Sequence, residues 1–143
     1  MNTQTRITSL LASLSKVRGI DQVSGDIIPL PGNDGATTEH LFINLYRSIP
    51  EGDNPKILLS ILRGNAQETI QLIAESVKPF LYDSLIVSIY NKSGGENSIR
   101  LYRTRVDGKD IPSVHNQYFT GFAQGEESRY PLIRDLLSIP PTH

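Results

Sequence analysis

The fold of this 143-residue chain depends on residues 57–76, which read ILLSILRGNAQETIQLIAES. In the first part of this stretch, residues 57–62, the positions that would lie on either face of a strand are almost all apolar. This is typical of a strand inside a sheet. Gly64 then favours a tight turn, and Asn65 begins a sequence that is typical of a capped helix start. We therefore predict a strand over 57–62, followed by a helix that begins at Asn65 and ends near residues 78–81.

The same periodicities predict helices at both ends of the chain and strands between them. The predicted helices cover about 5–18 and the residues after Ser128, and the predicted strands cover 26–30, 40–49, 85–90 and 98–106, with a last strand within 115–122. Turns rich in Gly, Pro, Asn and Asp join the strands of each group and predict antiparallel neighbours. The fold class is then α+β: one domain over 1–143 with three helices and a single antiparallel sheet of five to six strands, in the order α-βββ-α-βββ-α.

A short sequence recurs in two of the predicted strands, as Leu45-Tyr46-Arg47-Ser48 and as Leu101-Tyr102-Arg103-Thr104. Each copy leads to a turn with Gly and then to a helix. Two interpretations stay open: an internal repeat of 40–81 and 97–139, or two ordinary hairpin strands that precede Gly turns.

Composition excludes several classes of function. With 38% hydrophobic residues, 20% charged residues and a net charge of -1, the chain is neither mainly disordered nor a membrane protein. The absence of cysteine excludes a disulfide scaffold, a thiolate nucleophile and a cysteine-ligated metal. His40, His115 and His143 lack metal-ligand spacing, and neither a nucleophile elbow nor a phosphate loop is present. We expect a non-enzymatic protein with no metal and no cofactor, although an enzyme with a polar site near Arg63, Asn65 and His115 stays a third interpretation. In the absence of a signal peptide or membrane span we expect a cytoplasmic location.

Apolar residues on both faces of the predicted strands indicate a binding surface. Three helices cover one face of such a sheet, which leaves a second, apolar face, and exposed apolar patches usually mark interfaces. We therefore expect a protein-binding, adaptor- or chaperone-like module that acts as a homodimer through this face. A terminal helix that covers the face is the alternative. The residues expected on the second face are Phe42, Tyr46, Leu58, Leu62, Ile86, Arg100 and Tyr102.

Arginine and tyrosine occur together on the predicted strands 40–49 and 98–106, and such a sheet face can stack bases and bind phosphates. Strand alternation places Arg100 on one face and divides it from Arg103 and Arg105 on the other. A nucleic-acid-binding sheet is therefore the alternative to protein binding. Its expected contacts are Arg47, Arg100, Arg103 and Arg105.

The predicted element order resembles that of the small dimeric chaperones of type III secretion. The helix around Leu10-Leu11-Ala12-Ser13-Leu14 and the hairpin over 41–63 are compatible with that architecture. The resemblance implies a helix-flanked antiparallel sheet that binds an extended segment of a protein partner. It lies in architecture alone, so no functional residue is carried over, and roadblock-like and profilin-like folds have related element orders.

Overall fold

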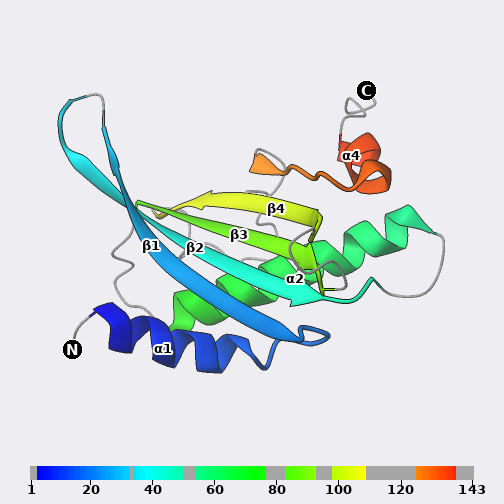
Figure 1. Ribbon diagram of the computed structural model, residues 1–143, viewed down its shortest axis with the longest axis horizontal. Helices are drawn as coiled ribbons and strands as arrows, with labels where there is room; N and C mark the ends of the chain where they lie inside the picture. The colour runs from blue at the N-terminus through cyan, green and yellow to red at the C-terminus, as the bar shows by residue number, and fades with distance from the viewer. Residues whose placement is uncertain are drawn as a thin grey trace.

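The computed structural model describes residues 3–32, 34–49, 54–76, 83–92, 98–108 and 125–137. Within them the chain forms three helices and one four-stranded sheet, in the order α-ββ-α-ββ-α (Figure 1). No helix in these ranges combines the length and the apolar character that a membrane span requires. The strand predicted within 115–122 lies outside the described residues. The elements are α1 (Thr3–Leu14), β1 (Gln22–Pro31), β2 (Thr37–Arg47), α2 (Pro55–Ser76), β3 (Ser84–Asn91), β4 (Arg100–Asp107) and α4 (Pro131–Leu137).

Helix α2 is the main departure from the sequence prediction. Residues 57–62, predicted as a strand, form the first turns of this 22-residue helix. Asn54 caps the helix, because its Oδ1 accepts hydrogen bonds from the backbone N–H of Lys56 at 3.0 Å and of Ile57 at 3.4 Å. Pro55 takes the first helical position, where its missing N–H costs nothing. The strand prediction was wrong because a short apolar run does not distinguish a buried strand from a helix end that packs on two sides.

The sheet is mixed rather than antiparallel. β1 pairs antiparallel with β2, β2 pairs parallel with β3, and β3 pairs antiparallel with β4. Parallel strands need a long crossover, and α2 provides it between β2 and β3. The predicted antiparallel sheet of five to six strands, in the order α-βββ-α-βββ-α, is therefore wrong, whereas the α+β class holds.

The hydrophobic core lies between one face of the sheet and the helices. α1 and α2 both pack on that face, and no described helix lies on the opposite one (Figure 1). α1 comes close to the sheet at Gly25, where an added Cβ would lie 3.0 Å from Ile43 Cδ1 and 3.2 Å from Leu11 Cδ2. The fully buried strand residues of the core are Leu41, Ile43, Leu45, Leu85, Val87, Ile89, Leu101 and Tyr102.

Candidate functional site

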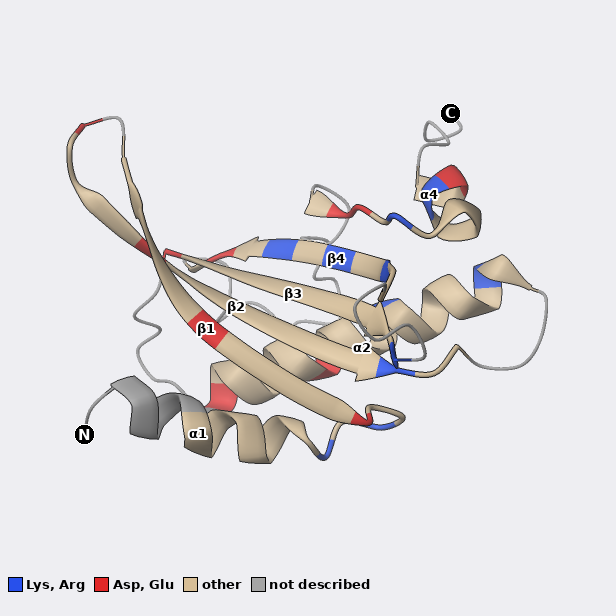
Figure 2. Ribbon diagram, viewed as in Figure 1, with Lys and Arg blue, Asp and Glu red and all other residues tan. Residues whose placement is uncertain are grey.

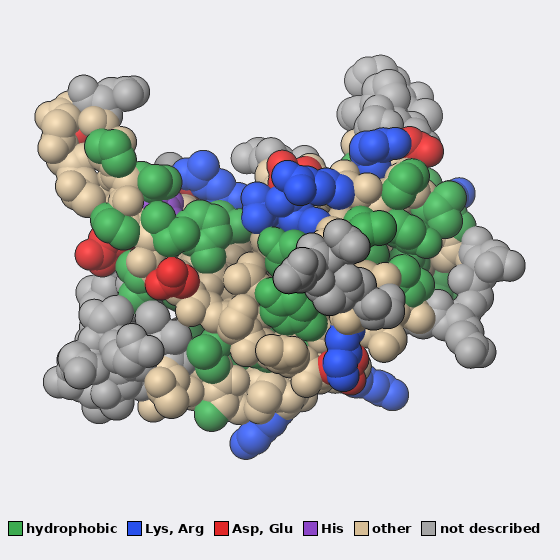
Figure 3. Space-filling view, viewed as in Figure 1, with side chains coloured by type: hydrophobic (Ala, Val, Ile, Leu, Met, Phe, Trp, Pro, Cys, Tyr) green, Lys and Arg blue, Asp and Glu red, His purple; other side chains and the backbone are tan. Residues whose placement is uncertain are grey.

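The candidate site is the face of the sheet that points away from α1 and α2, which we call the open face. Alternate residues of each strand lie on it, and the strand registers align them in rows from β1 to β4. Figure 3 shows hydrophobic side chains gathered over β1 to β3 and basic side chains over β4. The rows are Gln22, Tyr46, Tyr90 and Arg100; Ser24, Asn44, Ser88 and Arg103; Asp26, Phe42, Ile86 and Arg105; and Ile28, His40, Ser84 and Asp107.

One row of the open face has an apolar centre. Phe42 lies beside Ile86 in the register of β2 and β3. Ile86 is buried, yet it does not belong to the core under the helices. Tyr46 and Tyr90 stack two rows away, beyond the polar pair Asn44 and Ser88, with ring centroids 5.4 Å apart and 21° between the ring planes. The structure therefore brings together three residues that the sequence predicted for this face, namely Phe42, Tyr46 and Ile86.

The register of β4 with β3 places Arg100, Arg103 and Arg105 on the open face. Figure 2 shows basic bands along β4. A bulge between Ile89 and Tyr90 shifts the register, so Arg100 pairs with Tyr90 and shares a face with Arg103 and Arg105. The predicted division of Arg100 from the other two was wrong, because the extra residue of a bulge reverses the alternation beyond it.

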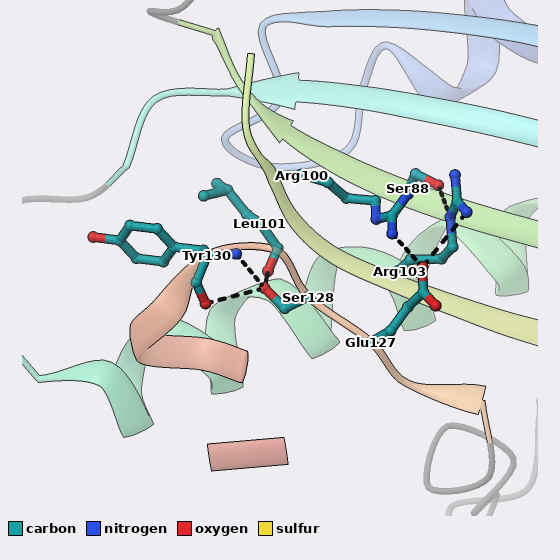
Figure 4. A network of polar contacts seen from close by, with 7 residues as sticks. All are labelled: Ser88, Arg100, Leu101, Arg103, Glu127, Ser128 and Tyr130. Atoms are coloured by element: carbon teal, nitrogen blue, oxygen red, sulfur yellow. Dashed lines mark hydrogen bonds and ion pairs between the residues drawn. The ribbon is translucent and has the colours of Figure 1, made fainter. Parts of the chain in front are cut away.

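Glu127 neutralises part of the positive charge of these three arginines (Figure 4). Arg100 Nη2 lies 2.5 Å from Glu127 Oε1, and Arg103 Nη1 lies 3.5 Å from the same oxygen. Arg103 Nε also donates a hydrogen bond to Ser88 Oγ at 2.8 Å. The buried Nε of Arg100 has no hydrogen-bond partner within the described part of the chain.

Arg105 is the most accessible of the three arginines. Its side chain is 57% exposed, compared with 12% for Arg100 and 28% for Arg103. Its ion pair with Asp107 is long, at 4.0 Å, and both partners are solvated, so it stabilises the chain little. Of the three, Arg105 therefore has the side chain most available for a contact outside the chain.

The edge of the sheet beyond β4 is closed by the chain itself. Arg103 and Glu127 exchange two backbone hydrogen bonds, at 2.8 and 3.0 Å, and Arg129 N–H donates to Arg100 C=O at 3.0 Å. Gly125 permits this close approach, since an added Cβ would lie 3.3 Å from the backbone N and O of Arg105. A further strand finds few free backbone groups there.

The second half of the β1 edge, residues 27–31, is blocked by different means. Gly32 N–H points toward β2, where it donates a hydrogen bond to Ala36 C=O. Because the direction of the backbone N–H alternates along a strand, the nitrogens of residues 27, 29 and 31 point away from β2. Positions 29 and 31 are proline and have no N–H to offer. The N–H of Ile27 is already bound by Asp26 Oδ1 at 2.9 Å. Prolines and capped donors are typical of edges that avoid pairing with another strand.

Two leucines predicted for the second face lie elsewhere. Leu58 and Leu62 belong to α2 and are buried in the core. Their predicted place on the open face was wrong because it depended on the strand that α2 replaces.

Tyr102 is likewise buried, on the helix side of β4. Its hydroxyl donates to Glu126 Oε1 at 2.8 Å, and Arg63 of α2 binds both oxygens of the same carboxylate at 2.7 Å. Burial raises the pKa of Tyr102 far above its usual range, and the neighbouring Glu126 adds to the shift. The hydrogen bond to Glu126 raises the pKa of Arg63. Tyr102, Arg63 and Glu126 thus join the segment around Glu126 to α2 and β4.

Arg47, predicted as a nucleic-acid contact, is buried at the end of β2 on the helix side. Its Nη1 donates to Asn65 Oδ1 at 2.5 Å and its Nε to Ser48 C=O at 3.2 Å. Desolvation lowers the pKa of Arg47, and Asp21 opposes the shift. Asn65 Nδ2 in turn donates to Arg18 C=O, so Arg47 joins α2 to the end of the α1 segment.

The polar grouping considered for an enzyme does not form within the described residues. Arg63 is bound to Glu126, Asn65 is buried against Arg47, and His115 lies outside the described ranges. The sequence analysis missed a different pair, since His40 Nδ1 and Ser84 Oγ lie 2.5 Å apart on the open face. Ser84 is fully buried, so its hydroxyl is not accessible to a substrate.

No protein-family model matches the chain, and no curated protein or solved structure is significantly similar to it. The resemblance to type III secretion chaperones depended on three strands before the second helix. The described order has two strands there, so the resemblance supports no further argument.

Proposed function

We propose that this chain is a non-enzymatic protein-binding module that acts as a homodimer through its open face. The observation that carries the proposal is the position of the apolar pair Phe42 and Ile86. The pair lies in the middle of one row of a sheet face that no described helix covers, with Phe42 half-buried and Ile86 8% exposed. The stacked Tyr46 and Tyr90 lie two rows away on the same face. Central aromatic anchors with a polar surround are typical of protein interfaces.

The blocked parts of both edges favour the face over strand addition as the mode of binding. Residues 27–31 of β1 offer two prolines and a capped N–H, and β4 is already paired through Glu127. A partner that binds this sheet along these stretches therefore meets side chains rather than free backbone N–H groups. Face-to-face packing of two sheets is the common way to bury such a surface.

Nucleic-acid binding is the second candidate, and the three arginines on one face favour it. Two observations weigh against it. Arg100 and Arg103 share one carboxylate, and the two tyrosine rings stack on each other rather than standing free. A salt-sensitive complex with a single-stranded oligonucleotide that Arg105→Ala weakens would favour this candidate over protein binding.

The proposal is tested by Phe42→Lys. Asp26 lies next to Phe42 in the register, so a lysine has a carboxylate neighbour in the isolated chain. In the dimer the same change introduces a charge into the apolar centre. We expect the dimer dissociation constant to rise by about thirtyfold or more, measured by sedimentation velocity on folded protein.

The matched control is Ile57→Lys, which replaces an apolar residue that is 59% exposed on α2, outside the open face. It should leave the dissociation constant unchanged, and circular dichroism should show both variants folded. Equal dimerisation of wild type and Phe42→Lys would contradict the proposal, and so would a wild-type chain that stays monomeric.

A further inference from the structure

We infer that the second copy packs on the open face about a two-fold axis parallel to the strands, with Asp26 of each copy against Arg105 of the other. This inference rests on the proposed function and adds the orientation of the dimer and the charged pair that selects it.

The inference starts from one row of the open face. Asp26, Phe42, Ile86 and Arg105 are consecutive neighbours across β1, β2, β3 and β4. The row therefore reads acidic, apolar, apolar, basic. Asp26 and Arg105 are both exposed at its ends, whereas Ile86 is buried. Figure 2 shows the same polarity, with basic bands along β4 and an acidic band on β1.

Symmetry restricts how two such faces can meet. In a two-fold dimer the same patch is used by both copies, so each residue's contact occurs twice. An axis parallel to the strands places β1 of one copy over β4 of the other. Each row then faces the same row of the second copy, read in the opposite direction. Asp26 meets Arg105, and the half-buried Phe42 meets the small part of Ile86, 8%, that the single chain leaves exposed.

The other in-plane axis, perpendicular to the strands, places each strand over itself. The three arginines of β4, Arg100, Arg103 and Arg105, would then face the same three arginines of the second copy. Like charges juxtaposed in an interface are strongly unfavourable. The three arginines thus favour the axis parallel to the strands.

The row of Gln22, Tyr46, Tyr90 and Arg100, two rows away, fits the same orientation. Tyr46 of one copy lies over Tyr90 of the other, which extends the aromatic stack across the interface. Gln22 lies over Arg100 and presents a side-chain oxygen that accepts hydrogen bonds. Aligned packing of two sheets allows these rows to stay in register near the axis.

The test uses two charge reversals, Asp26→Arg and Arg105→Asp, in the full chain. Each reversal replaces two attractive contacts by two repulsive ones. We expect each variant alone to dimerise about tenfold more weakly, or worse. An equal mixture should form heterodimers as readily as the wild type dimerises, because one chain then carries both basic groups and the other both acidic groups. The heterodimer is identified by native mass spectrometry.

A second pair of variants controls for net charge alone. Glu68→Arg on α2 and Arg134→Asp on α4 change the chain charge by the same amounts at exposed positions outside the open face. We expect each control variant to dimerise like the wild type, alone and in mixture.

The outcomes separate the two proposals. A wild-type dimer that Phe42→Lys disrupts, together with charge reversals that leave dimerisation unchanged, would overturn this orientation and keep the open face as the interface. A mixture of the reversals that does not form heterodimers would also overturn the orientation. A wild type that is monomeric would overturn both proposals.

Discussion

At the scale of single residues, position relative to the two faces determines what a side chain can do. Tyr46 and Tyr102 occur in the same short sequence context, yet Tyr46 is on the open face and Tyr102 is fully buried under it. Buried, the Tyr102 hydroxyl must keep a partner, and Glu126 provides it. Tyr102, which the sequence predicted for the binding face together with Tyr46, thus has a structural role.

The protonation of Tyr102 makes the stability of the chain depend on alkaline pH. An unfolded tyrosine ionises with a pKa of about 10. Burial raises the pKa of folded Tyr102 above that value, so the folded state keeps a proton that the unfolded state loses. The stabilisation is complete below about pH 10 and decreases as the pH rises further, by at most about 1.4 kcal/mol per pH unit.

Tyr102→Phe is the variant that tests this dependence. It should cost about 1–3 kcal/mol of unfolding free energy at neutral pH, because a hydrogen bond to a carboxylate is lost. Above about pH 10 its unfolding free energy should fall less steeply than that of the wild type. Denaturant unfolding at several pH values measures both effects, and parallel curves for the two proteins would refute the linkage.

At the scale of elements, the sequence predicted the strands well and the main helix badly. Strands near 40–49, 85–90 and 98–106 are confirmed within a few residues, since alternation and flanking turns are local signals. The start of α2 was missed, although Asn54 and Pro55 are a typical helix start. Gly64 was given too much weight as a turn, because glycine weakens a helix without necessarily ending it.

The residues of the candidate site could be predicted only where the strands that carry them were predicted correctly. Phe42, Tyr46 and Ile86 belong to strands with the correct alternation, so their common face is as expected. Leu58 and Leu62 were misplaced along with the false strand. The bulge that turns Arg100 toward Arg103 has no local sequence signal, because it arises from the pairing of β4 with β3.

Gly64→Ala tests the helical assignment directly. Gly64 lies inside α2, and an added Cβ would meet no atom within 4 Å. Alanine should therefore stabilise the chain by about 0.5–1 kcal/mol, seen as a rise of a few degrees in melting temperature. A tight turn at this position would give the opposite sign, so a destabilised variant would argue against a continuous helix.

At the scale of the whole molecule, the sheet is asymmetric in two ways. One face is packed against α1 and α2, and the other carries an apolar centre between an acidic and a basic strand. The second half of the β1 edge is blocked by Pro29 and Pro31, and the β4 edge is paired with the segment around Glu127. These features are the basis on which we propose that a second copy binds the open face in one orientation.

The most direct test of the open face as a dimer interface is the native mass of the unmodified full chain, measured over a range of concentrations at moderate salt. The chain has a mass of 15.9 kDa. We predict a species of twice that mass, which dissociates to the single chain on dilution without unfolding. A single species at 15.9 kDa at every concentration would contradict the open face as a dimer interface.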